Sequence, residues 1–146
     1  MISCLQKRAR MALDQARKFQ QLQEERTKTF HQLDEDHKVF LSTAPDYENG
    51  FDDYKKAVNE CTERFKLISR EIIKIRETLE QDTSLAKVAS LIGKVQELEE
   101  NKLKIVCDLQ LARFDPPVLN CSLDYFCLDN KLWTTQAMHC AKRMPT

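Results

Sequence analysis

The stretch FDDYKKAVNECTERFKLISREIIKIRETL, residues 51–79, decides the fold of this 146-residue chain. Its apolar side chains recur at alternating intervals of three and four residues, which is the heptad seam of a helix that packs against other helices. The seam positions are Phe51, Tyr54, Val58, Cys61, Phe65, Ile68, Ile72, Ile75 and Leu79. We therefore predict a long amphipathic helix over this stretch. The candidates for a partner-binding surface along its seam are Phe51, Val58, Phe65 and Ile72.

Two further helices are predicted on either side of this one, over residues 5–41 and 85–111. The first has apolar residues at eleven-residue intervals, close to the period of a straight helix. The third has a stripe at helical spacing, formed by Val88, Ile92, Val95, Leu98, Lys102, Ile105 and Leu109 and widened by Leu91, Leu103 and Val106. The breaks are short, and the first contains Pro45 and Asn49-Gly50, where Asn49 is a candidate helix cap. This pattern predicts an all-α fold of three long antiparallel helices.

The charge of the chain is balanced, with 23 basic and 23 acidic side chains. Proteins that bind nucleic acid mainly by electrostatics usually have a basic excess, so the composition argues against that class. Residues 1–18 differ, because they carry five basic residues and one acidic residue. We interpret them as a solvated basic helical extension of a three-helix domain over residues 19–112. Weak DNA binding through this extension stays open as an alternative.

Membrane insertion and secretion are not expected for this sequence. No stretch approaches the length of apolar sequence that crosses a bilayer, and the start lacks the apolar core of a signal peptide. We therefore expect the protein in the nucleus, the cytoplasm or both, without a membrane partner.

Two polar residues, Arg26 and His37, fall on the otherwise apolar stripe of the first helix. Antiparallel packing across the two breaks brings His37 near Tyr54, and Tyr54 near Leu109 or Gln110. It also brings Arg26 near Phe65 and near Glu99 or Glu100. We predict two polar layers in the core, which set the register of the helices as polar residues do in coiled coils. The alternative is a binding or pH-responsive site, since histidine titrates near neutral pH.

The sequence contains no residue pattern that indicates an enzyme active site. No cysteine or serine lies in a recognisable nucleophile motif, and two glycines cannot form a phosphate-binding loop. The spacing of Cys121, Cys127, His139 and Cys140 is too uneven for a structural zinc site. We predict no catalytic residues, no metal and no cofactor.

The last segment, residues 113–146, loses the helical periodicity and contains Pro116-Pro117. We expect it to be a divergent, disordered tail.

The ordered polar and apolar positions of the three helices resemble the "required for excision 1-B" domain family over about residues 19–111. The positions that carry the resemblance are the run LQEER at 22–26, then Phe30, Leu33, His37, Tyr54, Val58, Thr62, Phe65, Ser69, Arg70, Glu71, Gln96, Leu98, Glu99, Glu100, Leu103, Leu109, Gln110 and Leu111. The resemblance implies a small, mostly helical protein linked to DNA excision repair, with no catalytic residues to carry over. The family pattern continues into a further helical stretch, which residues 113–146 do not match.

The expected function is that of a non-enzymatic accessory or scaffold protein in DNA excision repair. The heptads favour action through protein–protein contacts, with excision-repair components as partners implied by the resemblance. A missing further helix would leave an apolar groove open beside residues 51–79, so we also expect self-association or a required partner. A general coiled-coil adaptor without a role in repair is the alternative.

Overall fold

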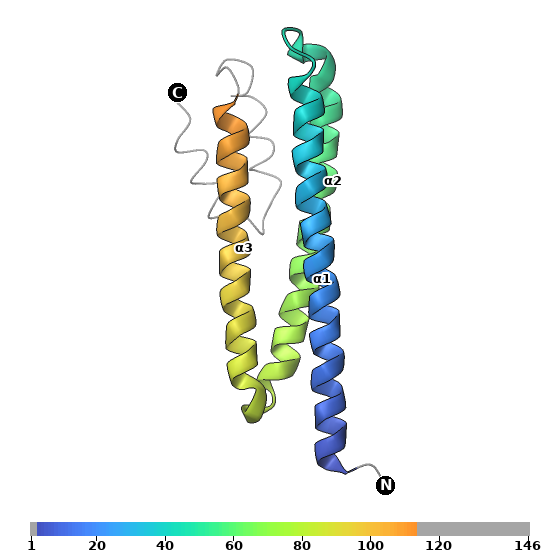
Figure 1. Cartoon of the computed structure of the whole chain (residues 1–146), viewed down its shortest axis with the longest axis vertical. Helices are drawn as coiled ribbons and strands as arrows, with labels where there is room; N and C mark the ends of the chain where they lie inside the picture. Colours follow the sequence, from blue (N-terminus) through green and yellow to red (C-terminus); the bar gives the residue numbers. More distant parts are fainter. Residues whose placement is uncertain (1–2, 114–146) are drawn as a thin grey trace.

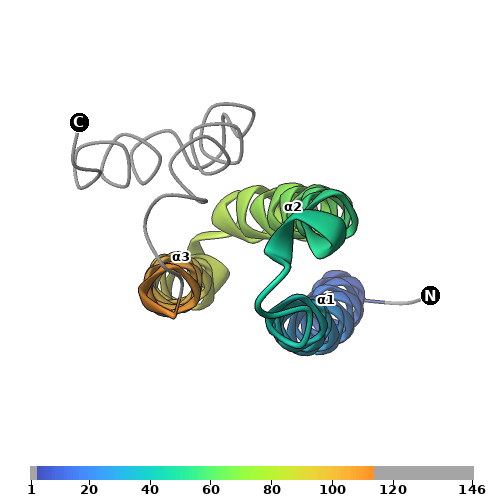
Figure 2. The same ribbon diagram turned by 90° about the horizontal axis from the view of Figure 1, so that it is seen from above.

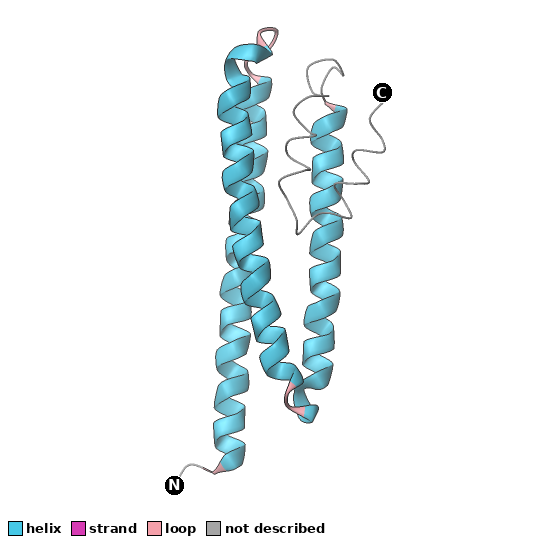
Figure 3. Ribbon diagram, turned by 180° about the vertical axis from the view of Figure 1, so that it is seen from behind, coloured by secondary structure: helices cyan, strands magenta, loops and turns pink. Residues whose placement is uncertain are grey.

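The computed structural model describes residues 3–113, which form three long helices joined by two short turns (Figure 1). The helices are α1 (Cys4–Leu41), α2 (Tyr47–Glu80) and α3 (Ala86–Ala112), with a short 3₁₀ helix, η1 (Thr83–Leu85), before α3. Successive helices run in opposite directions, and the described residues contain helix and short loops only (Figure 3). The prediction of an all-α fold with three long antiparallel helices is confirmed. The predicted tail lies outside the described residues.

The helix α2 is the central element, because it contacts both α1 and α3. It lies beside α1 near the first turn and leans towards α3 at its other end (Figures 1 and 2). Two apolar clusters fill the interior. The first, near the turn between α2 and α3, contains Ile68, Ile72, Ile75, Leu79, Ala89 and Ile92. The second contains Leu33, Val58, Cys61, Phe65 and Leu103.

The α2 seam is an interior feature, and this corrects its interpretation as a partner-binding surface. Val58, Phe65 and Ile72 are all buried, and Phe51 is half-buried beside Phe40 of α1. The helices α1 and α3 cover this seam, because burying a large apolar side chain stabilises the fold by about 1.5–3 kcal/mol. Along the seam itself, the groove expected beside residues 51–79 is filled by α1 and α3. A hollow of about 400 Å³ remains between α1 and α2, beside Leu22 and Leu67.

The basic extension is the beginning of α1 and continues into the rest of that helix without a break. Ser3 and Gln6 form a capping box, in which the Gln6 amide donates to the Ser3 hydroxyl at 3.2 Å. The Ser3 amide in turn donates to the Gln6 side-chain oxygen at 2.9 Å. This reciprocal pair satisfies two backbone donors that a helix start leaves free, so it fixes where α1 begins.

The Asn49-Gly50 pair lies inside α2 and not in the predicted break before it, because α2 already begins at Tyr47. The Asn49 amide donates to the Asp46 carboxylate at 2.7 Å within the first turn of the helix, and Asn49 is not the cap. A β-carbon added to Gly50 would lie only 2.7 Å from the Thr43 side chain. The glycine is needed for this close approach between helix and turn, and not for a turn conformation of its own.

Candidate functional site: buried polar layers and an exposed face of α3

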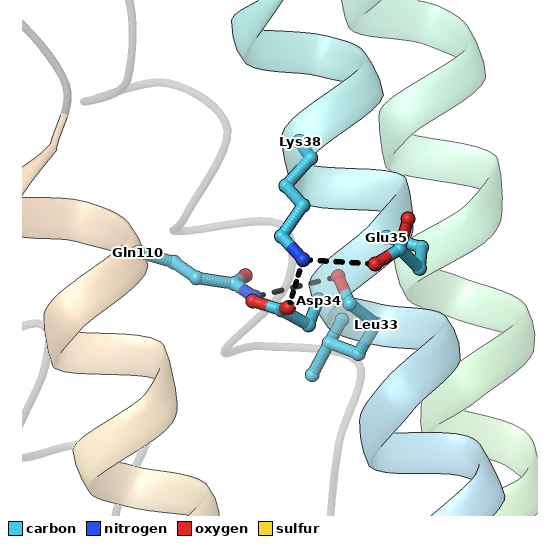
Figure 4. Close-up of polar contacts among 5 residues, drawn as sticks. All are labelled: Leu33, Asp34, Glu35, Lys38 and Gln110. Carbon is cyan, nitrogen blue, oxygen red and sulfur yellow. Dashed lines mark hydrogen bonds and ion pairs between the residues drawn. The ribbon is translucent and has the colours of Figure 1, made fainter.

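A chain of hydrogen bonds joins all three helices near the first turn. His37 of α1 is fully buried, and its Nδ1 lies 3.3 Å from the Tyr54 hydroxyl of α2. That hydroxyl donates to the Gln110 side-chain oxygen of α3 at 2.8 Å. The Gln110 amide then donates to the Leu33 carbonyl of α1 at 3.5 Å (Figure 4). The structure thus brings together the three residues placed in this layer from sequence.

The direction of this chain fixes the tautomer of His37. Tyr54 has a single hydroxyl proton, which it gives to Gln110, so the hydroxyl oxygen is left to accept from His37. His37 therefore carries its proton on Nδ1 when neutral. An aromatic stack adds to the layer, since the Phe40 ring lies parallel to that of Tyr54 at 4.6 Å between centroids.

Burial lowers the pKa of His37 below its ordinary value, and Arg113 adds to this effect while Asp34 opposes it. Burial also raises the pKa of Tyr54 and brings that of Cys61 to about 11. At neutral pH all three groups are uncharged. The layer is therefore a neutral, hydrogen-bonded set inside an apolar core.

Acidification is expected to destabilise the fold through His37. Its neutral form is favoured in the folded state, so its contribution is complete above the unfolded pKa of about 6.5 and is lost as the pH falls towards the lower folded value. Between these limits the free energy of unfolding should fall by up to about 1.4 kcal/mol per pH unit. Denaturant titrations at several pH values would measure this slope.

The matched comparison uses the two histidines of α1, because His31 is exposed. A His37→Gln variant should lose most of the extra slope, whereas His31→Gln should keep it. Equal slopes in wild type and His37→Gln would show that His37 does not report on folding.

The second polar layer surrounds Arg26, which lies between the two apolar clusters and is only 4% exposed. Its guanidinium donates to Gln96 of α3 at 2.6 Å, to Ser69 of α2 at 3.5 Å and to Gln23 of its own helix at 2.9 Å. Glu99, the partner expected from sequence, acts on Arg26 by charge, without a hydrogen bond to it in the described structure. The layer is therefore built mainly on amide and hydroxyl oxygens.

The electrostatics of this layer are incompletely balanced. Burial lowers the pKa of Arg26, which Glu99 and Glu100 partly offset. Burial and the neighbouring Glu97 raise the pKa of Glu100, while Arg26 lowers it. The buried Glu99 Oε2 has no hydrogen-bond partner among the described residues, and a cavity of about 10 Å³ lies beside it. That volume is at the lower limit for one water molecule, which would satisfy the carboxylate.

Gln96 and Ser69 were not predicted as partners of Arg26, although the sequence contains a signal for Gln96. Ala89, Gln96, Leu103 and Gln110 recur every seven residues, and in the structure the line that they form faces the core. Ser69 follows the buried Ile68 and gives no comparable signal.

The predicted stripe of α3 was wrong as a core face at most of its positions, because Val88, Leu98, Ile105 and Leu109 are exposed. Ile92 and Leu103 are buried, and Val95 and Val106 are half-buried. The helix is rotated so that Gln96 and Gln110 turn inward and meet Arg26 and Tyr54. Each buried polar group left without a hydrogen-bond partner would cost about 1–3 kcal/mol of stability. That cost is as large as the stability that burying another leucine would add. We call the outward positions the α3 stripe: Val88, Leu91, Val95, Leu98, Lys102, Ile105 and Leu109.

Surface charges near the His37 layer form local pairs. Lys38 bridges Asp34 at 2.9 Å and Glu35 at 2.8 Å, and these contacts raise its pKa (Figure 4). Such exposed pairs contribute little to stability. Within residues 3–113 no cluster of histidine, cysteine or acidic side chains could hold a metal ion. The cysteines and the histidine that were considered for zinc in residues 121–140 lie outside this range.

The three helices, with their polar positions in this order, match a known protein family. The sequence pattern named DNA repair REX1-B matches residues 14–113, more than half of the chain. The chain belongs to the DNA repair REX1-B family. The resemblance inferred over residues 19–111 is confirmed, and the REX1-B match includes the end of the basic extension. Both polar layers and the α3 stripe lie within it.

Two relatives are called "Required for excision 1-B domain-containing protein". The one from Bos taurus is 37% identical over 91 residues, which cover 62% of this chain and 49% of the relative. The one from Mus musculus is 33% identical over 94 residues, covering 64% and 54%. The chain thus spans about half the length of these REX1-B relatives. No solved structure matches it. Among the described residues, no helix is long and apolar enough to cross a membrane.

Proposed function

We propose that this REX1-B chain is a non-enzymatic accessory protein of DNA excision repair that acts through protein–protein contacts. The repair component is supported by the family and by the words "required for excision" in the names of the relatives. We expect the protein to work in the nucleus, the cytoplasm or both, with excision-repair components as partners.

The α3 stripe is the observation that supports action through protein–protein contacts. Five of its side chains are large, apolar and exposed: Val88, Leu91, Leu98, Ile105 and Leu109. They recur with heptad spacing along one side of a helix whose other side is already packed in the core. Exposed apolar patches of this size mark interaction sites in soluble proteins. By contrast, the buried side chains of Arg26, His37 and Gln110 are engaged in hydrogen bonds between helices.

Removal of ultraviolet photoproducts in cells tests this proposal. Cells without the protein should remove photoproducts more slowly, and wild-type chain should restore the rate. A Leu98→Asp variant should fail to restore it, because it places a charge in the middle of the stripe. The exposed neighbour provides a matched control, so Glu97→Ala should restore the rate fully.

Two results would decide against the proposal. Normal photoproduct removal in cells without the protein would refute the repair role and favour the general adaptor. Restored removal by a folded Leu98→Asp chain would show that the α3 stripe is not the contact surface.

A second candidate is weak DNA binding by the first turns of α1. The helix α1 begins beyond the turn between α2 and α3 (Figure 1), and Arg8 pairs with Asp82 of that turn at 3.0 Å. Arg10, Arg17 and Lys18 follow along α1 as exposed side chains. If three phosphates are neutralised, the logarithm of the binding constant should fall with the logarithm of salt concentration with a slope of about −2.7. Fluorescence anisotropy on duplex DNA would measure the slope. Substitution of all three residues by glutamine should abolish the binding, and affinity that is independent of salt would refute this candidate.

A further inference from the structure

We propose that the α3 stripe pairs with the α3 stripe of a second copy of this chain, with the two helices antiparallel. This inference extends the proposed function, since it names the first of its protein contacts. Its test measures oligomeric state and not repair, so the two proposals can fail separately.

The register follows from the heptad positions. In an antiparallel pair, alternate seam positions of one helix face those of the other in layers. Centring the pair near Glu100 places Leu91 opposite Leu109 of the second copy, and Val95 opposite Ile105. At the middle, Leu98 faces Lys102 of the second copy. Every layer across residues 91–109 is then apolar on both sides except the two that contain Lys102.

Lys102 selects the antiparallel orientation. In a parallel pair the two copies of Lys102 would face each other in one layer, and two like charges would be brought together as their surroundings lose water. In the antiparallel pair each Lys102 meets a leucine. Its ammonium group already turns away from the stripe, since Nζ lies 4.2 Å above the centre of the Phe30 ring of α1. The aliphatic stem is therefore left to pack against Leu98.

On the outer flank of the stripe the charges agree with this orientation, whereas on the inner flank Glu99 of each copy meets its counterpart. Lys94 and Asp108 lie on the same flank of α3, fourteen residues apart. In the antiparallel register Lys94 of each copy comes beside Asp108 of the other, which forms two pairs of opposite charge. Asn101, midway between them, meets its own counterpart and adds no repulsion. Flanking pairs of this kind set the orientation and the choice of partner in coiled coils.

The exposed area is adequate for a modest dimer. The five large apolar side chains are between 45% and 68% exposed, with Leu98 at the upper limit. Together they leave on the order of 500 Å² uncovered, comparable with the largest apolar patches on monomeric proteins. Flanking residues would add to this, whereas stable interfaces bury about 800 Å² per partner. We therefore expect a reversible dimer.

Sedimentation equilibrium of the full chain tests the pairing. The wild-type chain should be a dimer at micromolar concentrations. Leu98→Asp should raise the dissociation constant roughly thirtyfold or more, as expected for a central residue of an interface. Leu98 is exposed in the single chain, so its helix content and unfolding should stay close to wild type. Charge reversal in Lys94→Glu should weaken the dimer, and the double variant Lys94→Glu, Asp108→Lys should restore it.

Disulfide trapping tests the orientation. In the antiparallel pair Leu91 faces Leu109, so Leu91→Cys alone and Leu109→Cys alone should form no new intermolecular disulfide, whereas the double variant should. The unaltered chain, oxidised in the same way, gives the background from its own cysteines. A disulfide that peptide mapping locates between the two introduced cysteines of either single variant would show a parallel pair and overturn the proposed orientation.

A monomeric full chain at tens of micromolar would overturn the dimer itself. If a hydrophobic dye then fails to bind, residues 114–146 cover the stripe. If the dye binds, the stripe is exposed and is a contact surface for a different protein. The chain could form this dimer while its loss has no effect on photoproduct removal. That combination would refute the proposed function and leave this inference standing.

Discussion

The Arg26→Met variant is expected to unfold with a free energy about 3 kcal/mol lower than that of the wild-type chain. Arg26 is 4% exposed and donates hydrogen bonds to Gln96, Ser69 and Gln23. Methionine fills most of the volume but donates nothing. The Gln96 oxygen then loses its partner at 2.6 Å, and the buried carboxylate of Glu99 loses the positive charge beside it. Buried polar groups without partners cost more than the pairing itself contributes.

Denaturant unfolding measures the effect, with Lys28→Met as the matched control. Lys28 lies two residues further along α1 and is exposed, so its replacement should change stability by no more than about 0.5 kcal/mol. A double variant, Arg26→Met with Glu99→Leu, should recover part of the loss, because both charged groups are then gone. If Arg26→Met unfolds like the wild type and keeps the same oligomeric state, the layer does not hold the helices in register.

The Phe65→Ala variant is expected to lose about 3–5 kcal/mol of stability. Phe65 is 3% exposed in the second apolar cluster, and its ring lies 4.7 Å from that of Phe30 on α1. Its removal would leave a cavity where all three helices meet, because the same cluster contains Leu33 of α1 and Leu103 of α3. Thermal and denaturant unfolding would both report the change.

The control for Phe65 is Leu67→Ala on the same helix. Leu67 is 58% exposed, so its truncation should cost much less. This pair also separates the two interpretations of the α2 seam. If Phe65 served partner binding, its replacement would leave the single chain stable and abolish an interaction. A stability loss similar to that of Leu67→Ala would therefore contradict a core position.

Much of the fold follows from the sequence by itself. The heptad spacing over residues 51–79 sets the core face of α2, because a 3.6-residue period brings positions three and four apart onto one side of a helix. The interruption of an apolar stripe by Arg26 and His37 identified both polar layers. The short breaks between long helices fixed the antiparallel order, and with it the neighbours of His37.

The tertiary structure alone decided the rotation of α3 and therefore the surface that stays open. This helix has two apolar faces at different angles, and the spacing of its residues favours the α3 stripe as readily as the line through Leu103. Local periodicity cannot choose between them. The choice is made by Arg26 and Tyr54, which require Gln96 and Gln110 as partners across the core. The cost of leaving those buried groups unpaired turns the leucines of the stripe outward.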